Sequence, residues 1–115
     1  MEKNREELYD LKELRAIADG DDLFFHEMIT LFISQIESAM PEIRNHVEKR
    51  DYAKVKAILH KIKPSVAVMG IITVKEIIDE IEHMDLSVIE NEVFSILILR
   101  IEKTIELVNT RLRIL

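Results

Sequence analysis

Apolar residues recur at intervals of three and four along almost the whole chain, and very little interrupts them. Only two glycines and two prolines occur in 115 residues, so the chain has few of the residues that form tight turns. Isoleucine and valine favour strands, but here they repeat with the helical period and not with the period of two that a strand requires. The sequence therefore predicts an all-α protein built from a few long helices.

The first two predicted helices lie on either side of Gly20. Residues 1–7 are charged and are expected to be frayed, and the short amphipathic helix after them stops at this glycine. Asp21 or Asp22 then caps a long second helix, which Pro41 should bend or split. The predicted buried residues are Leu8, Leu11, Leu14 and Ile17 in the first helix and Phe25, Met28, Ile29, Phe32, Ile36, Ala39, Met40, Ile43 and Val47 in the second.

Three more helices are predicted downstream. Asp51 caps the third, Gly70 marks the turn after it, and Ser87-x-x-Glu90 reads as a capping box that opens the fifth. The predicted buried residues are Val55, Leu59, Ile62, Val66 and Met69 in the third helix, Val74, Ile77, Ile78 and Ile81 in the fourth, and Ile89, Val93, Ile96, Leu97, Ile101, Ile105, Val108 and Leu112 in the fifth. Short connections between the four long helices imply antiparallel neighbours. We expect an up-down-up-down four-helix bundle with a short extra N-terminal helix, as one domain over residues 1–115.

Charge and composition weigh against several classes of function. The net charge of −6 and the pI of about 5.2 argue against nucleic acid or an anionic membrane surface as a partner. No apolar run approaches the ~18 residues of a membrane span, and the N-terminus is not a secretion signal. Because there is no cysteine, disulfides and thiol chemistry are excluded. We expect a soluble, cytoplasmic monomer.

The third predicted helix carries the strongest candidate for chemistry, His60. On a helical wheel its imidazole points roughly 150° away from the centre of the apolar face, into solvent. Its helical neighbours are two lysines and three small residues, namely Lys56, Ala57, Lys63, Pro64 and Ala67. A neutral imidazole is a good nucleophile near pH 7, and the small residues leave room for a second protein to approach it.

Phosphoryl acceptance suits this arrangement. A phosphoryl group in flight spreads negative charge over its oxygens, so catalysis depends on positioning and on a nearby positive charge. Lys63, three residues after His60, would supply that charge as a mobile point donor. Pro64 cannot donate to the carbonyl of His60, so the helix either kinks there or ends and restarts. A single kinked helix is favoured, because the apolar phase is continuous across the proline.

The pattern His60-x-x-Lys63-Pro64-Ser65-(x)4-Gly70 closely resembles the signature of the histidine phosphotransfer (HPt) domain family, His-x-x-Lys-Gly-Ser-(x)4-Gly. The resemblance covers residues 8–85, and the last helix matches only in length and periodicity. Upstream residues that resemble the family's N-terminal pattern are Asp10, Leu11, Gly20, Asp21, Phe25, Phe32, Pro41 and Asp51. The one clear departure is Pro64, which stands where the family usually has glycine and keeps the position small.

The resemblance implies a phosphorelay carrier whose N-terminal helix lies across one end of the bundle. His60 would accept a phosphoryl group from an aspartyl phosphate of one response-regulator receiver domain, such as that of a hybrid sensor histidine kinase, and pass it to another. The chain has no glycine-rich nucleotide loop, so we expect a carrier and not an enzyme. No cofactor is expected on the chain, and the magnesium ion would belong to the receiver. The alternative from another class is a helical adaptor bundle without phosphotransfer.

Glu82 is a further candidate, because it is about level with His60 if Gly70 marks a helical hairpin. Its carboxylate either orients the second imidazole nitrogen or is an ordinary solvated side chain. In some members of the HPt family an amide occupies about this place, and a carboxylate would instead repel the phosphoryl group. The sequence leaves both alternatives open.

Two other patterns have structural readings as well as functional ones. Glu80-x-x-His83 matches half of a di-iron motif, but a second copy is missing, so no metal site is predicted; His26 and His46 are expected at the surface. The apolar stripe Phe24, Met28 and Leu31 lies beside the buried face of the second helix. Either the first helix covers it, or it is exposed as a docking patch for the partner.

Overall fold

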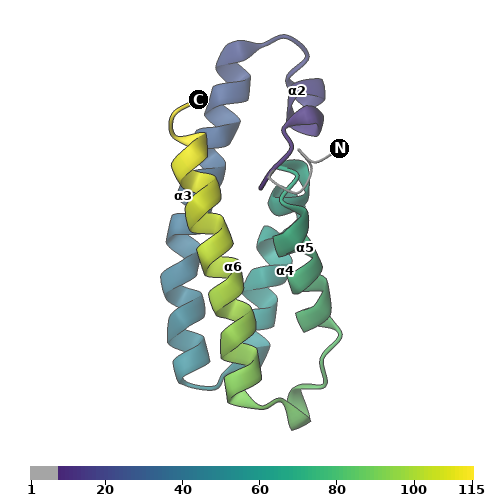
Figure 1. Ribbon diagram of the computed structural model, residues 1–115, viewed down its shortest axis with the longest axis vertical. Helices are drawn as coiled ribbons and strands as arrows, with labels where there is room; N and C mark the ends of the chain where they lie inside the picture. The colour runs from purple at the N-terminus through teal and green to yellow at the C-terminus, as the bar shows by residue number, and fades with distance from the viewer. Residues whose placement is uncertain (1–7) are drawn as a thin grey trace.

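The structure, a computed structural model, describes residues 8–115, and every regular element in that range is a helix (Figure 1). The elements are α2 (Lys12–Ala18), α3 (Asp22–Glu48), α4 (Tyr52–Val68), α5 (Ile72–Glu82), the 3₁₀ turn η1 (Leu86–Val88) and α6 (Asn91–Leu112). The all-α prediction is confirmed, whereas the prediction for residues 1–7 lies outside the described residues. None of these helices is both long and apolar enough to cross a bilayer.

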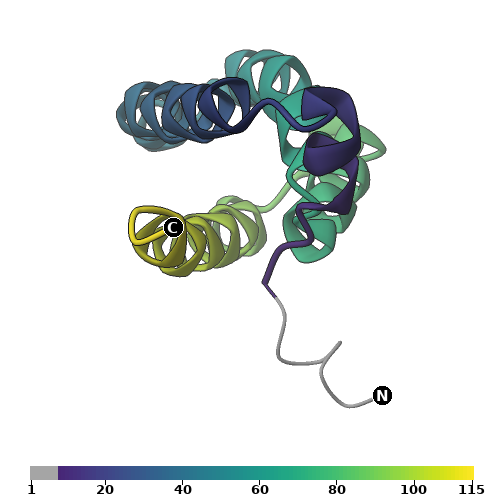
Figure 2. The same cartoon turned by 90° about the horizontal axis from the view of Figure 1, so that it is seen from above.

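The four long helices pack side by side, and consecutive ones reverse direction in Figure 1. Contacts join α3 to α4, α4 to α5, α5 to α6, and α6 back to α3. Figure 2, which looks along the helices from above, shows α2 as a short separate element at one end. The segment before α2 is tied to the end of α4, because the backbone N–H of Asp10 donates to the carbonyl of Met69 at 3.2 Å.

Aspartate side chains open both α3 and α4. Asp21 accepts from the backbone N–H of Phe24 at 3.0 Å, and Asp51 accepts from that of Lys54 at 3.4 Å. These are the unpaired amide groups that every helix start must satisfy. Of the two residues considered as the cap of the second helix, Asp21 is therefore the cap.

Both prolines lie inside unbroken helices. α3 continues through Pro41, so of the two alternatives predicted there, a bend or a split, the split is excluded. Met40 and Ile43 are buried on either side while Pro41 is exposed, and their burial offsets the backbone hydrogen bond that the proline removes. α4 likewise continues through Pro64, which confirms one helix over this stretch and excludes an end near Lys63.

The start of α6 differs from the prediction. Ser87 lies in η1, where Oδ1 of Asp85 accepts from its backbone N–H at 3.0 Å and from its hydroxyl at 2.7 Å. The capping box of Ser87 and Glu90 is therefore wrong: Glu90 precedes the helix without a side-chain cap, and α6 begins at Asn91.

The buried face of α6 differs from the predicted one only over its first two turns, since the predicted residues Leu97, Ile101, Ile105, Val108 and Leu112 are all buried. Phe94 and Ile98 are buried, whereas Val93 and Ile96 are 46% and 54% exposed. Between Val93 and Leu99 only Ser95 is polar, so the pattern alone left open which side of these turns is buried. The phase is set by tertiary packing, since the ring of Phe94 lies 4.6 Å from that of Tyr52 on α4. The predicted buried residues of the first helix also need correction. Leu8 precedes α2, and Ile17 is 52% exposed, whereas Ala18 is buried.

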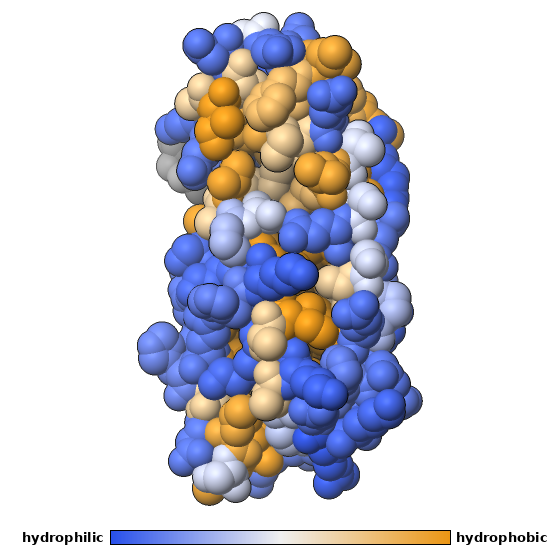
Figure 3. Space-filling model, turned by 180° about the vertical axis from the view of Figure 1, so that it is seen from behind, coloured by the Kyte–Doolittle hydropathy of each residue, from blue (hydrophilic) through white to orange (hydrophobic). Residues whose placement is uncertain are grey.

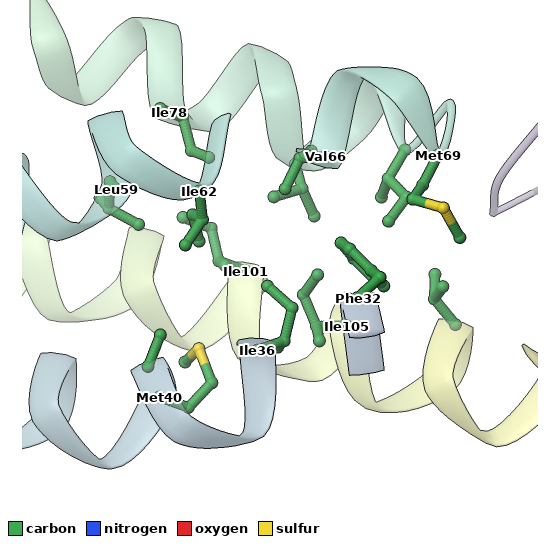
Figure 4. Close-up of a cluster of buried hydrophobic side chains, with 14 of the residues drawn as sticks. Phe32, Ile36, Met40, Leu59, Ile62, Val66, Met69, Ile78, Ile101 and Ile105 are labelled. Carbon is green, nitrogen blue, oxygen red and sulfur yellow. The ribbon is translucent and has the colours of Figure 1, made fainter. Parts of the chain in front are cut away.

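The four long helices share one continuous aliphatic core (Figure 4). The core side chains labelled in Figure 4 are Phe32, Ile36 and Met40 of α3, Leu59, Ile62 and Val66 of α4 with Met69 just after it, Ile78 of α5, and Ile101 and Ile105 of α6. Because this core takes one face of α4 completely, the opposite face of α4 is left to solvent.

Candidate functional site

His60 is presented to solvent by a helix whose neighbouring residues are in the core. Leu59 and Ile62 are 0% and 2% exposed, whereas the side chain of His60 is 78% exposed. Ala57 and Pro64 are exposed next to it, and Ala67 is half-buried. The imidazole therefore stands on an open surface among small side chains, as the helical wheel predicts.

Glu82, the last residue of α5, contacts the imidazole directly. Nδ1 of His60 lies 2.8 Å from Oε2 of Glu82, whose side chain is 20% exposed. Hydrogen bonds from Lys63 first and His60 second hold the pKa of the Glu82 carboxyl below its usual range. The carboxylate is therefore an acceptor, and the Nδ1–H of His60 donates to it. Of the two alternatives for Glu82, the structure has the one in which it meets the imidazole.

Lys63 is held by two carboxylates of α5 and is not the mobile point donor that we expected. Its Nζ lies 2.6 Å from Oδ1 of Asp79 and 2.8 Å from Oε1 of Glu82. These bonds, that to Asp79 first, raise the pKa of the Lys63 ammonium above its usual range. The side chain is 27% exposed, so it is partly buried between α4 and α5.

Asp79 connects Lys63 to a second lysine on α5. Its Oδ2 lies 3.2 Å from Nζ of Lys75, four residues earlier, and bonds from Lys63 first and Lys75 second lower the pKa of its carboxyl. The sequence analysis missed Asp79. The signal was present in its spacing of four from Lys75 and three from Glu82, which places all three on one side of α5. We refer to Lys75, Asp79, Lys63, Glu82 and His60 as the His60 network.

Lys56, which was predicted beside the imidazole, is turned to the end of α5. Its Nζ is within 3.4 Å of the backbone carbonyl of Met84, and it is half-buried. Its positive charge also contributes to lowering the pKa of Asp85, after the hydrogen bonds from Ser87. Lys56 therefore serves the α5–η1 connection in this structure, and the ammonium that joins His60 through Glu82 is that of Lys63.

An apolar groove of about 230 Å³ begins one turn beyond His60. It is lined by Leu14 and Ile17 of α2, Met28, Leu31, Phe32 and Gln35 of α3, Pro64, Ser65 and Val68 of α4, and Met69. Figure 3 shows apolar side chains gathered around a hollow in the upper part of this face, where α2 and the first half of α3 lie. The first helix flanks the predicted stripe without covering it: Phe24 and Met28 are half-buried and Leu31 is 61% exposed.

The other histidines do not form a metal site. Among residues 8–115, no group of three or more His, Cys, Asp or Glu side chains is arranged to hold a metal ion. His83 and His26 are exposed and bond to the carbonyls of Asp79 and Asp22 at 2.7 and 2.9 Å. The surface prediction is wrong for His46, which is half-buried with an enclosed Nδ1 that has no hydrogen-bond partner in the described part of the chain. It lies between the buried Ile43 and the half-buried Val47 near the end of α3, so the packing of those residues partly encloses it.

Comparison with known proteins gives one match, to a family. The model of the Hpt domain matches residues 27–110, which include α4 with His60 and also nearly all of α6. The resemblance noted from the sequence reached only residue 85, so the family pattern extends further than those motifs show. Neither a search of curated proteins nor a search of solved structures found a match. Since the family model spans well over half of the chain, this protein belongs to the Hpt domain family.

Proposed function

We propose that this chain, like other Hpt domains, takes part in histidine phosphotransfer in a phosphorelay, as a phosphocarrier and not as an ATP-binding kinase. We propose that in this chain His60 is the phosphoacceptor, and that it takes its phosphoryl group from an aspartyl phosphate of one receiver domain and passes it to the aspartate of another. The observation that carries the proposal is the 2.8 Å bond between Nδ1 of His60 and Glu82 on an otherwise exposed imidazole.

The bond to Glu82 selects the tautomer that the reaction needs. With the proton on Nδ1, the lone pair of the ring lies on Nε2, which is the nitrogen free to react. This lone pair attacks phosphorus, and the bond between phosphorus and the aspartyl oxygen breaks with its electron pair going to the receiver's carboxylate. The ring keeps the proton on Nδ1 and becomes positively charged, and the carboxylate of Glu82 stabilises that charge. Onward transfer is the reverse reaction with a second receiver.

We further propose that Lys63 offsets the charge of Glu82 near the phosphoryl group. A carboxylate beside His60 would by itself repel the incoming group, but Lys63 is bonded to the same carboxylate at 2.8 Å. The ammonium of Lys63 has three N–H donors, two of which are used by Asp79 and Glu82. The third remains for a phosphoryl oxygen, and the two carboxylates restrain the side chain in advance.

The apolar groove beside Pro64 is our proposed docking surface for the receiver. It starts one helical turn from His60, so a partner seated in it would bring its aspartate near the imidazole. The magnesium ion that phosphoryl transfer requires would be held by the receiver, because aspartyl phosphate chemistry takes place on that side. A hybrid sensor histidine kinase is the kind of protein that would supply the first receiver.

The proposal includes an up-down-up-down four-helix bundle in a cytoplasmic monomer. The reversal of direction between consecutive helices in Figure 1 and the contacts of α6 with both α5 and α3 support that topology. The alternative function is an adaptor bundle that binds a partner through the groove without any chemistry. The bond between His60 and Glu82 favours the carrier, since an adaptor has no need of an oriented, exposed imidazole.

The test is direct transfer from a receiver. A receiver domain phosphorylated with radiolabelled phosphate is incubated with this protein and magnesium, and the protein is examined for label that is lost in acid and retained in base. We expect the wild type to be labelled and His60→Gln to be unlabelled but folded, since an exposed substitution usually changes stability by within about 0.5 kcal/mol. Labelling of the variant, or a wild type that binds receivers and is never labelled, would favour the adaptor.

A further inference from the structure

The charges of the His60 network cancel while the imidazole is neutral. Two lysines, Lys63 and Lys75, face two carboxylates, Asp79 and Glu82, in an alternating series of contacts of 2.6 to 3.2 Å. Glu82 has a role at the imidazole, and Lys63 has one at the phosphoryl group. The side chain of Asp79 bonds to Lys63 and Lys75, and that of Lys75 bonds to Asp79. Neither side chain bonds to His60, so the proposed reaction does not explain why these two residues are there.

We propose that Asp79 and Lys75 set how strongly the phosphorylated state of His60 is stabilised, Asp79 as a positioning residue that shares the ammonium of Lys63 with the phosphoryl group. This inference rests on the proposed function. Asp79 makes the shortest contact of Lys63, at 2.6 Å, so its carboxylate already offsets part of the positive charge that the third N–H would bring to a phosphoryl oxygen. Lys75 weakens that offset, because it is bonded to the other oxygen of Asp79.

A carrier needs such a restraint because it must release what it accepts. If the full positive charge of Lys63 acted on the phosphoryl group, it would stabilise phosphohistidine and slow the onward step. An interaction that stabilises phosphohistidine more than the transition state raises the barrier to transfer. When the positive charge of Lys63 is shared between Asp79 and the phosphoryl group, phospho-His60 and the phosphorylated receiver stay closer in free energy. The network thereby makes a carboxylate at Glu82 compatible with reversible transfer.

The effect of these residues is electrostatic and not one of packing. The side chains of Asp79 and Lys75 are 36% and 39% exposed, and neither belongs to the aliphatic core. Replacing them changes the net charge of the network without creating a cavity. Asp79→Asn makes the network positive by one charge, Lys75→Met makes it negative by one charge, and the double variant restores neutrality.

The experiment measures the stability of phospho-His60 in these three variants. His60 is phosphorylated with the small-molecule donor phosphoramidate. Phospho-His60 is identified as the ³¹P signal that is absent from His60→Gln, and its rate of hydrolysis is measured from the loss of this signal. In parallel, the equilibrium distribution of label between the protein and one receiver is measured. We expect phospho-His60 to be favoured about three- to tenfold in Asp79→Asn, disfavoured by a similar factor in Lys75→Met, and near the wild-type level in the double variant.

Matched controls carry the same charge changes away from the network. Glu76→Gln on the exposed side of α5 and Lys103→Met on α6 should leave both measurements unchanged. Shifts of the two single variants in the same direction, a double variant that does not return toward the wild type, or equal effects of the controls would overturn the proposal. If phosphoramidate labels His60 and no receiver does, the proposed relay function fails, while the hydrolysis rates still decide the role of Asp79.

Discussion

Nδ1 of His60 and Oε2 of Glu82 lie 2.8 Å apart, although the two residues are 22 positions apart in the chain. The contact exists because α4 and α5 form a hairpin about Gly70, and because Glu82 is on the flank of α5 that faces α4. It gives an exposed imidazole one defined tautomer and leaves Nε2 as the free nitrogen.

The contact predicts different outcomes for two substitutions of Glu82. Glu82→Ala removes the acceptor of the Nδ1–H bond, and we expect phosphoryl acceptance to slow about tenfold or more. Glu82→Gln should slow it less than Glu82→Ala does, because its amide oxygen accepts the same bond but carries no charge to stabilise the positive ring. Rapid-quench measurement of the transfer rate from one receiver checks this, with Glu80→Ala as the control on the exposed side of α5. A Glu82→Ala variant as fast as Glu80→Ala would contradict the assignment.

Lys63→Ala should slow transfer while leaving receiver binding nearly unchanged. The ammonium of Lys63 stabilises charge on the moving phosphoryl group, and removing one such donor typically costs about ten- to a thousandfold in rate. Transfer kinetics and a separate binding titration with the same receiver distinguish the two effects. Lys61→Ala is the control, because Lys61 is exposed on the same helix and outside the His60 network. Equal losses of binding and transfer would make Lys63 a docking residue.

Pro64 is exposed, one turn from His60, and lines the apolar groove. We expect Pro64→Gly to transfer well and Pro64→Leu to fold well but transfer poorly, because a branched side chain would obstruct the receiver. Both variants restore the missing backbone amide. Both also lose about 0.4–1 kcal/mol of folding stability, because the unfolded chain gains conformational freedom without the proline. Transfer rates of both variants with one receiver decide the matter. A fast Pro64→Leu would mean that the proline matters for the backbone alone.

Gly70 should be the less replaceable of the two glycines. Both have positive φ, 67° at Gly70 and 86° at Gly20. A Cβ at Gly70 would lie 2.2 Å from the backbone oxygen of Asp10, whereas a Cβ at Gly20 would meet nothing within 4 Å. Gly20→Ala therefore carries only backbone strain, about 1 kcal/mol, and Gly70→Ala should cost about 1–3 kcal/mol more in the free energy of unfolding. Urea unfolding of both variants measures the difference, and equal midpoints would show that the segment at Asp10 moves aside freely.

The His60 network predicts a loss of stability in acid. The pKa values of Asp79 and Glu82 are lowered by folding from ordinary values of 3.8 and 4.5, so both carboxylates stabilise the fold above those values. This contribution is lost as the pH falls through the lower, folded-state pKa values. Urea midpoints of the wild type and of Asp79→Asn with Glu82→Gln, measured between about pH 7 and 3, should converge toward acid. Parallel curves would mean that the ion pairs to Lys63 contribute nothing to stability.

The sequence by itself determined the class of fold, most of the buried faces of α3 to α5, and the exposure of His60. These depend on local periodicity, because a helix that buries Leu59 and Ile62 must turn His60 outward wherever it packs. The motif around His60 also led to the family. The sequence also predicted that one helix continues through Pro64, because the apolar residues keep the same helical period on both sides of it.

Only the tertiary structure decided which partners the site residues have. The register of α4 against α5 is set by core packing and by the hairpin at Gly70. This register decided that Glu82 contacts the imidazole and that Lys63 is bonded to Asp79. The same holds for the start of α6, where six of the seven residues 93–99 are apolar and the choice between Val93 and Phe94 was left to the ring of Tyr52. Periodicity fixes which face of one helix is apolar, but contacts between helices depend on side chains distant in the sequence, and a helical wheel contains no information about them.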